Sequence, residues 1–352
     1  MLEKIREKSI WEFLKETRLP VILYGMGNGA DMIMNVLNEI GVQVSDIFAS
    51  DGFVRGHSFH GYKVLKYSDV CEKYEDFIII MTFAIHDAPT LERVKEINQE
   101  HTVLSPTVPI AGKGLFTLDY IRENEELFDR AYEILADEKS KSDFVDVLNF
   151  KISGKIEYLL RCQSEKSELY ETVFPLTETE TIVDLGAYDG DTIREFLSVT
   201  NGKYRKIYAF EPDEKNFRKL CAKTEGLDNI ERYNVGAWDR EETLYFQKKA
   251  GRNSRQDDGG IPVSFNSVDN LISDEVTFIK MDIEGAELRA IEGARHTIEK
   301  CSPKLYICAY HRNEDAFAIP LKINGICSDY KIYYRHHPYI PAWESNFYCV
   351  AE

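Results

Sequence analysis

The sequence lacks the features that mark membrane, secreted or zinc-binding proteins. It has no apolar run as long as a membrane-spanning helix requires, and residues 1–20 mix charged and apolar residues, unlike a signal peptide. Its seven cysteines are scattered and never spaced as CxxC, which predicts reduced thiols rather than a zinc site or a disulfide framework. These absences predict a cytoplasmic protein with no membrane partner and no metal.

The chain also lacks the positive charge that nucleic acid binding requires. It contains 43 lysines and arginines against 60 aspartates and glutamates, a formal net charge of -17. A phosphate backbone needs a basic face, so nucleic acid is not an expected partner. The hydrophobic share of 43% can fill packed cores, and a length of 352 residues favours two domains.

The first α/β unit is expected within residues 1–110. The apolar run at 21–24 leads into a glycine turn and an amphipathic segment, and DFIIIMTF at 76–83 predicts a parallel strand buried on both faces. This pattern predicts a small Rossmann-like domain that either binds a nucleotide or nucleotide-sugar and presents the acceptor, or serves as a structural or dimerising module. The turn nearly matches the dinucleotide pattern. Its expected ligand residues are Gly25, Gly27, Gly29 and Asp51.

The rest of the chain divides into two parts. Residues 111–172 are charged, helix-periodic and poor in glycine and proline, which predicts a helical connector. Residues 173–352 carry five apolar strands that alternate with helical segments, then two strands at 330–335 and 346–350 that are too close for a helical crossover and should pair antiparallel. The expected fold class is therefore α/β, with the doubly wound sheet of a class I methyltransferase.

The stretch TIVDLGAYDGDTI, residues 181–193, predicts the central strand of this sheet and a ligand loop at its carboxyl end. A dinucleotide site would favour GxGxxG, but here Asp184, Gly186 and Gly190 are accompanied by two further aspartates. Carboxylates repel a diphosphate and attract an ammonium or sulfonium group. S-adenosyl-L-methionine carries both cations and no phosphate, so it is the expected cofactor. Glu211, just after the next strand, is placed to bind ribose hydroxyls.

These residues resemble, together with four later motifs, the FkbM family of S-adenosylmethionine-dependent methyltransferases. The later motifs are YAFEPDEKNFRKL, NVGAWD, FIKMDIEGAELRAIEGA and YHR, and the resemblance spans about half the chain, from residue 181 onward. Members typically methylate hydroxyl oxygens of sugars and secondary metabolites, so the resemblance implies an O-methyltransferase with a small-molecule acceptor. Many relatives lack a Rossmann-like domain at the amino terminus, and the role of that domain is not covered. Carried over by position, the cofactor site comprises Asp184, Gly186, Ala187, Tyr188, Asp189, Gly190, Thr192, Glu211, Pro212, Asn234, Val235, Gly236, Ala237 and Asp282.

Methyl transfer from a sulfonium is an in-line displacement that depends on alignment, and a hydroxyl acceptor needs a general base within hydrogen-bond reach. Asp282 ends the fourth strand, Glu284 lies in the following turn, and His311 ends the fifth strand. We expect Asp282 or His311 to remove the proton, with Asp282 preferred. The three side chains could instead hold a divalent metal, but the sequence fixes no geometry for one.

The acceptor pocket is expected near Glu287 and the loop RHHPYIPAW at 335–343. The alternatives are a Glu287 that only complements a helix dipole and an ordinary hairpin loop. The polar segment 248–260 is expected to be a surface loop, or a lid over the site. The pocket residues are predicted to be Glu287, Arg335, His336, His337, Tyr339 and Trp343.

Two other interpretations of the whole chain stay open. One is a non-catalytic protein built from two nucleotide- or cofactor-binding modules. The other is an NAD-dependent oxidoreductase acting through the first domain, although no cluster of histidine, lysine and tyrosine for hydride transfer stands out there. A homodimer is also left open.

Overall fold

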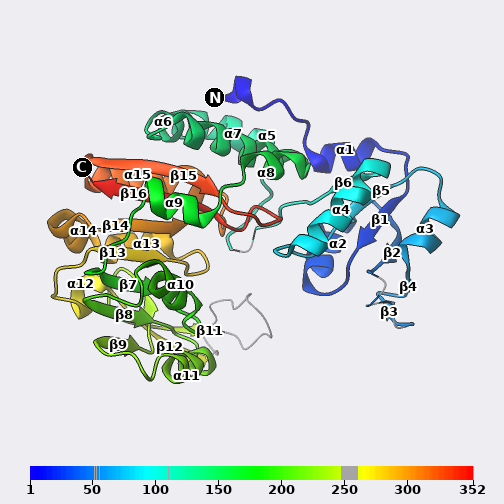
Figure 1. The fold of residues 1–352 in the computed structure, drawn as a ribbon. Helices are drawn as coiled ribbons and strands as arrows, with labels where there is room; N and C mark the ends of the chain where they lie inside the picture. The colour runs from blue at the N-terminus through cyan, green and yellow to red at the C-terminus, as the bar shows by residue number, and fades with distance from the viewer. Residues whose placement is uncertain (51, 53, 55, 110, 247–260, 352) are drawn as a thin grey trace.

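The computed structural model describes the whole chain except residues 51, 53, 55, 110, 247–260 and 352. Figure 1 shows two α/β parts side by side, with a layer of helices along one side of the larger part. Among the described residues, no helix has both the length and the apolar composition needed to cross a membrane. A short 3-10 helix, Leu2–Lys4, precedes the first part.

The first sheet has six strands in the order β3-β4-β2-β1-β5-β6. All pairs are parallel except the β3–β4 hairpin, which the sequence pattern did not reveal. The strands predicted at 21–24 and 76–83 are confirmed as β1 and β5, whereas the parallel strand β4 was not predicted and a separate ligand-binding role for this part stays a prediction. The elements are α1 (Ile10–Glu16), β1 (Val21–Tyr24), α2 (Asn28–Glu39), β2 (Val44–Phe48), β3 (Ser58–Phe59), β4 (Tyr62–Leu65), α3 (Tyr67–Lys73), β5 (Ile78–Met81), α4 (Ala88–Glu100) and β6 (Thr102–Leu104).

The segment after the first sheet is helical, as its periodicity predicts. The longest helix, α7, starts where the Asp137 carboxylate accepts the Ser140 N–H and ends at Gly154, whose φ of 69° is left-handed. One apolar core extends from the first sheet through these helices into the second sheet, so they form a structural layer rather than a free linker. The helices are α5 (Leu118–Glu123), α6 (Glu125–Glu133), α7 (Glu138–Ser153), α8 (Glu157–Cys162) and α9 (Lys166–Thr172).

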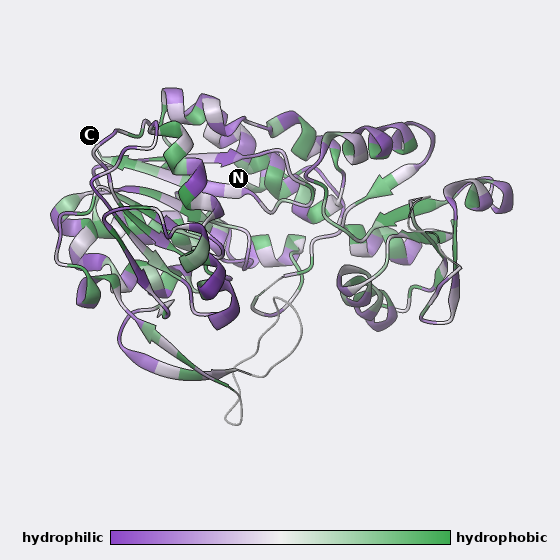
Figure 2. Ribbon diagram, turned by 60° about the horizontal axis from the view of Figure 1, so that its bottom comes forward, coloured by the Kyte–Doolittle hydropathy of each residue, from purple (hydrophilic) through white to green (hydrophobic). Residues whose placement is uncertain are grey.

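The second sheet has seven strands in the order β15-β16-β14-β13-β7-β8-β9, with β16 antiparallel to both of its neighbours. The other pairs are parallel, and the inner strands are buried along their length and drawn apolar in Figure 2. This confirms the predicted class I methyltransferase sheet with its terminal antiparallel pair. The strands are β7 (Thr181–Leu185), β8 (Lys206–Phe210), β9 (Ile230–Tyr233), β13 (Phe278–Met281), β14 (Lys304–Cys308), β15 (Tyr330–His336) and β16 (Ser345–Ala351). The helices are α10 (Asp191–Val199), α11 (Glu214–Lys223), α12 (Val268–Leu271), α13 (Glu287–Gly293), α14 (Arg295–Cys301) and α15 (Asp315–Ile326).

The third strand predicted for the second sheet, at 230–238, is confirmed only over 230–233, because the chain leaves that sheet after β9. Asn234 sits at the break, where its Nδ2 donates to the Glu211 carbonyl at 2.8 Å. The chain then enters a separate three-stranded sheet of β10 (Gly236–Ala237), β11 (Glu242–Phe246) and β12 (Ile261–Asn266). Gly236 is required there, since a Cβ would lie 2.3 Å from the Phe265 ring. The predicted loop or lid at 248–260 lies outside the described residues.

Candidate cofactor and active site

The predicted ligand loop lies where the carboxyl ends of β7, β8 and β13 meet. Gly186 and Ala187 donate their N–H groups to the Phe210 carbonyl at 3.0 and 2.9 Å. Gly186 has φ +85°, and a Cβ there would lie 1.9 Å from the Asp282 carbonyl oxygen, so only glycine allows the two loops to approach this closely. The fold therefore brings together residues that are about a hundred positions apart in the sequence.

Glu211 follows β8 and is 6% exposed. Its Oε2 accepts the Tyr188 N–H at 2.9 Å and its Oε1 accepts the Asp213 N–H at 2.8 Å. Each carboxylate oxygen keeps a second lone pair for a hydroxyl donor. Burial raises the pKa of Glu211 to about 7. This acid is therefore held in place, half neutralised at neutral pH, and able to bind a diol.

The acidic character of the loop is weaker than the sequence suggests. Asp189 forms ion pairs with Lys223 and, at 3.4 Å, with Arg194, and the hydrogen bond from Lys223 lowers its pKa. Its charge is therefore compensated within the protein. Asp191 opens α10 and accepts the Thr192 N–H at 2.8 Å. The prediction that the Asp189 carboxylate attracts a cationic cofactor is wrong, because Arg194 on α10 and Lys223 on α11 already compensate its charge.

Below the loop lies a buried ion pair that the sequence interpretation missed. The Lys280 Nζ lies 3.7 Å from both Asp184 Oδ1 and Asp282 Oδ2, and it donates to Thr192 Oγ1 at 3.2 Å. Burial raises the pKa of Asp184, which is 0% exposed, to about 6. Burial disfavours the charged form of Lys280, yet Asp184 and Asp282 raise its pKa above the ordinary value. Asp184 is therefore paired with Lys280 in the interior and does not face a ligand directly. The feature of the sequence that could have predicted this pair is the lysine within the apolar run FIKM.

The three predicted catalytic residues do come together. Asp282 is 32% exposed at its side chain, and its Oδ1 accepts the Tyr310 hydroxyl at 3.1 Å. The His311 Nε2 lies 3.4 Å from Asp282 Oδ1 and 3.6 Å from Glu284 Oε2. Two partly exposed carboxylates thus lie at the carboxyl edge of the second sheet, which we call the mouth of the site, with a buried imidazole beside them.

His311 is better suited to hold a proton than to remove one. Its side chain is 1% exposed, and its Nδ1 lies 3.0 Å from Glu287 Oε1. Burial lowers the pKa of the imidazole, but the three surrounding carboxylates together raise it to about 9. At neutral pH the ring is cationic and donates toward Asp282, which favours Asp282 over His311 as the base.

Glu287 does not reach the cleft. It is 1% exposed, and its Oε1 accepts the Ile283 N–H at 3.0 Å and the Gly285 N–H at 3.4 Å, closing the turn before α13. The predicted acceptor contact is replaced by a turn-closing role. Atoms of Glu287, His311 and Asp315 suited to a cation lie within 4.8 Å of one another. A proton on His311 and the nearby Lys151 ammonium balance the two carboxylates, so we assign no metal ion to this cluster.

Three further residues of the predicted acceptor pocket lie in the interior. Arg335 forms an ion pair with Asp137 at 2.6 Å, and so fastens α7 to β15. His336 is 0% exposed and contacts the Ser345 hydroxyl, and His337 lies between the Ser164 carbonyl and the Tyr348 hydroxyl at 2.7 and 2.6 Å. Burial lowers the pKa of His336 to about 3 and that of His337 to about 4, so both rings are neutral. The prediction that these three side chains line a pocket is wrong, because β15 turns them toward the helical layer and its neighbouring strand.

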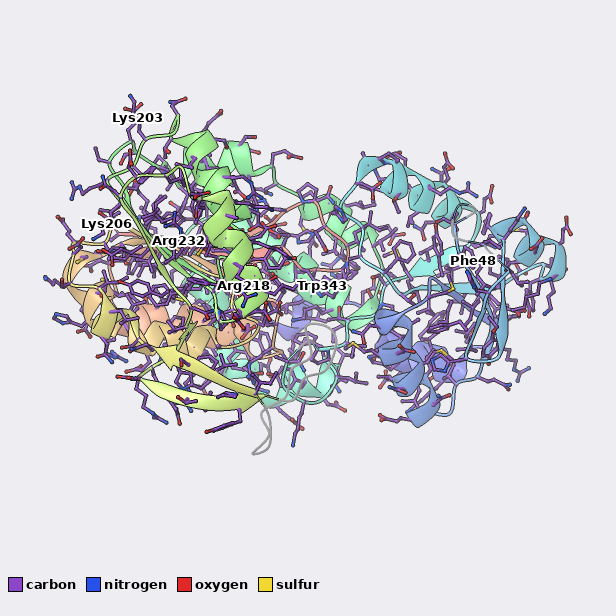
Figure 3. All side chains as sticks on the ribbon, turned by 90° about the horizontal axis from the view of Figure 1, so that it is seen from below. Phe48, Lys203, Lys206, Arg218, Arg232 and Trp343 are labelled. Carbon is purple, nitrogen blue, oxygen red and sulfur yellow. The ribbon has the colours of Figure 1, made fainter. Side chains whose placement is uncertain are left out.

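The loop after β15 joins the carboxyl ends of the two sheets. Ile340 exchanges backbone hydrogen bonds with Ile85, which follows β5, at 2.7 and 3.0 Å. The Tyr339 ring stacks on His86 at 6.0 Å, and Tyr339 also contacts Trp343. Figure 3 places Trp343 on the side of the larger part that faces the first. An acceptor site at Tyr339 and Trp343 stays a prediction.

The glycine turn of the first sheet has the predicted strand–turn–helix form. Gly25 and Gly27 have φ of +112° and +104°, and a Cβ on Gly29 would lie 2.1 Å from the Thr82 carbonyl oxygen. The fourth predicted ligand residue, Asp51, lies outside the described residues. Asp31 in the first turn of α2, paired with His60 at 2.6 Å, adds negative charge where a pyrophosphate would sit. A ligand at this turn stays a prediction.

Comparison with protein families gives a match that covers the site residues of the second sheet described above. Residues 184–339 match the family model described as the Methyltransferase FkbM domain. This range contains the ligand loop, Glu211, Asp282 and His311. A search of curated proteins found no match to the chain.

Comparison with solved structures extends the likeness to the whole chain. The chain is similar to a methyltransferase FkbM from Methylobacillus flagellatus KT, with TM-score 0.73 and 24% identity, over 99% of this chain and 92% of that one. An rRNA methylase from Streptococcus thermophilus has TM-score 0.35 and 15% identity, over 50% and 89% of the two chains. A SAM dependent methyltransferase from Aquifex aeolicus has TM-score 0.32 and 15% identity, over 55% and 90%. The first likeness shows a shared fold that includes the first sheet and the helical layer.

Proposed function

Because residues 184–339 carry an FkbM methyltransferase domain, we propose that the protein transfers a methyl group from S-adenosylmethionine to a hydroxyl oxygen of a small-molecule acceptor. The observation that carries the proposal is the meeting of Glu211, the Gly186 turn and Asp282 at the carboxyl ends of neighbouring strands. Doubly wound sheets bind their ligands at this edge.

The residues at this edge fit the cofactor. Glu211 is a buried acid with free lone pairs, as ribose recognition requires, and the turn at 186–190 begins and ends with glycines whose φ values of 85° and 84° are left-handed. Asn234 and the residues after it border the same edge and would lie beside the adenine. When bound, the cofactor supplies an electrophilic methyl group on a sulfonium. A cation is accepted more readily than a diphosphate, since Asp282 and Glu284 add negative charge to the mouth.

The chain's own residues supply the proton acceptor. The Asp282 carboxylate takes the hydroxyl proton as the acceptor oxygen forms its bond to carbon and the carbon–sulfur bond breaks. The Tyr310 hydroxyl and the protonated His311 hold Asp282 in orientation through Oδ1. We propose a sugar or a related hydroxylated metabolite as the acceptor, with Tyr339 and Trp343 as aromatic surfaces beside it.

Calorimetric titration tests the cofactor proposal directly. We expect S-adenosylhomocysteine to bind with a Kd in the micromolar range, and NAD and UDP-glucose to bind at least about a hundredfold more weakly at the same site. Labelled methyl transfer to a panel of sugars and nucleotide-sugars then identifies the acceptor. Binding of NAD without binding of S-adenosylhomocysteine would overturn the proposal.

Glu211→Gln should weaken S-adenosylhomocysteine binding by roughly tenfold to a hundredfold, because hydrogen bonds to a charged acceptor are worth about 1.5–3 kcal/mol. The ionised acid binds the diol, and burial raises the pKa of Glu211 to about 7. Affinity of the wild type should therefore increase as pH rises from about 6 to 8, and the variant should lose this increase. The raised pKa also means that Glu211 favours the folded state at low pH and loses this contribution as pH rises through about 7. Equal pH dependence in the two proteins would exclude Glu211 as the ribose ligand.

A further inference from the structure

Four ionisable side chains meet in the interior directly behind the mouth carboxylates. They come from separate segments: Lys151 from α7, Glu287 from α13, His311 from the loop after β14, and Asp315 from α15. None is more than 5% exposed. Lys151 and Asp315 belong to no predicted motif and do not take part in the proposed methyl transfer. Burying charged side chains costs folding free energy, and such clusters are enriched at functional sites.

The contacts show how the charges are balanced. Asp315 Oδ2 accepts the Arg312 N–H at 2.7 Å, and its Oδ1 has no hydrogen-bond partner within the part of the chain that the structure describes. Among the described residues, no carboxylate lies within 4.0 Å of the Lys151 Nζ, which instead lies 4.7 Å from the centre of the Phe116 ring. Lys151 nevertheless attracts Asp315 electrostatically. With His311 protonated, two cations balance two carboxylates, and removing one charge leaves another uncompensated.

The cluster reaches the cleft through His311. Its Nδ1 faces Glu287 at 3.0 Å, and its Nε2 faces Asp282 and Glu284 at 3.4 and 3.6 Å. The Tyr310 ring lies 4.2 Å from the imidazole and also donates to Asp282. Asp315, on α15, lies close to the same ring, since candidate ligand atoms of Glu287, His311 and Asp315 are all within 4.8 Å of one another. Any change in the charge at Asp315 is therefore felt by the group that orients the proton acceptor.

Resting on the proposed methyl transfer, we propose that Asp315 is a positioning residue: balanced by Lys151, it keeps His311 protonated so that Nε2–H holds Asp282 and Glu284 toward the acceptor. The helical layer thereby contributes to the reaction through α7, although α7 supplies no group to the cleft. Burial and the Glu287 charge raise the pKa of Asp315 to about 7, and His311 and Lys151 oppose this rise. Asp315 is thus ionised over the upper part of the pH range in which His311 carries its proton.

The variant Asp315→Asn removes this charge with little change of shape. We expect the pKa of His311 to be about one unit lower than in the wild type, which corresponds to a tenfold weaker affinity for the proton. An NMR titration of the His311 ring, identified by its absence in His311→Asn, measures this shift. The pH profile of kcat should shift its alkaline limb in the same direction, with the Kd for S-adenosylhomocysteine unchanged within about threefold.

Asp143→Asn is the matched control. Asp143 is another buried carboxylate, on α7, but its partner at 3.0 Å is Lys139 rather than His311. It should leave the His311 titration unchanged. Should Asp315→Asn fail to fold, the double variant Lys151→Met/Asp315→Asn keeps the cluster neutral and should fold, and its His311 should shift in the same direction by a smaller amount, because loss of the Lys151 cation favours the protonated ring.

Two results would overturn the assignment: an unchanged His311 titration in both Asp315 variants, or a stoichiometric divalent metal ion present in the wild type and absent from Asp315→Asn. The NMR titration requires no acceptor. The two proposals can therefore fail separately. If only methyl transfer is wrong, the wild type shows no turnover, but the His311 titration still differs between the wild type and Asp315→Asn.

Discussion

Asp282→Asn should lower kcat by about 100- to 10,000-fold, the range that removal of a positioned general base produces. An amide keeps the size of the side chain and its contact with the Tyr310 hydroxyl, but it cannot accept the proton of a hydroxyl group. Binding of S-adenosylhomocysteine should remain within about tenfold of the wild type, because Glu211 and the loop after β7 are untouched. The measurement pairs methyl transfer to the acceptor found by the panel with calorimetry on the same preparation.

Glu284→Gln is the control for this change. Glu284 also faces His311, with its Oε2 3.6 Å from the ring Nε2, but its side chain is more exposed than that of Asp282, 46% against 32%. The Glu284→Gln variant should lower kcat by less than about tenfold. If Glu284→Gln removes activity and Asp282→Asn preserves it, the two carboxylates exchange roles. If both variants keep full turnover, neither carboxylate is the base.

The second large effect is on stability. Lys280→Met should lower the free energy of unfolding by about 3–5 kcal/mol, because it leaves the Asp184 carboxylate buried without its cation. Burial already raises the pKa of Asp184 to about 6, and removing Lys280 raises it further. Protonation relieves the loss, so the deficit should be smaller at pH 5 and grow as pH rises through and above about 6. Urea unfolding at pH 5 and pH 8 measures it.

The double variant Lys280→Met/Asp184→Asn separates a broken pair from a misfolded strand. With both charges gone, most of the lost stability at pH 8 should return, since a neutral replacement of a buried pair is often tolerated. If the double variant is less stable than Lys280→Met alone, Asp184 has a partner other than Lys280. A loss below about 1 kcal/mol in the single variant would show that water reaches the pair.

The order of elements could be predicted from local pattern. Apolar runs at Thr181–Leu185 and Phe278–Met281 predict strands buried on both faces, and a short link between the last two strands can only join them antiparallel. Glycine turns that require left-handed φ are also visible in the sequence. For these reasons the positions of Gly186, Glu211 and Asp282 at one sheet edge followed from the sequence.

Only the tertiary structure decided which charged side chains are compensated by an oppositely charged partner. Asp189 is compensated by Lys223 from α11, and Lys280 joins Asp184 across two neighbouring strands. The sequence presents all of these residues as separate charges, because their partners lie tens of positions away and come together only through the sheet. Arg335 illustrates the same limit, since its partner Asp137 caps helix α7 and lies 198 positions earlier in the sequence.

By itself, then, the sequence determined the second sheet and the residues at its carboxyl edge, because strand burial and turn geometry depend on neighbours along the chain. The fold decided that His311 holds a proton, that His336 and His337 are neutral and interior, and that Lys151 and Asp315 stand behind the cleft. These properties depend on burial and on charges brought from other elements, and Coulomb interactions follow distance in space rather than distance in sequence.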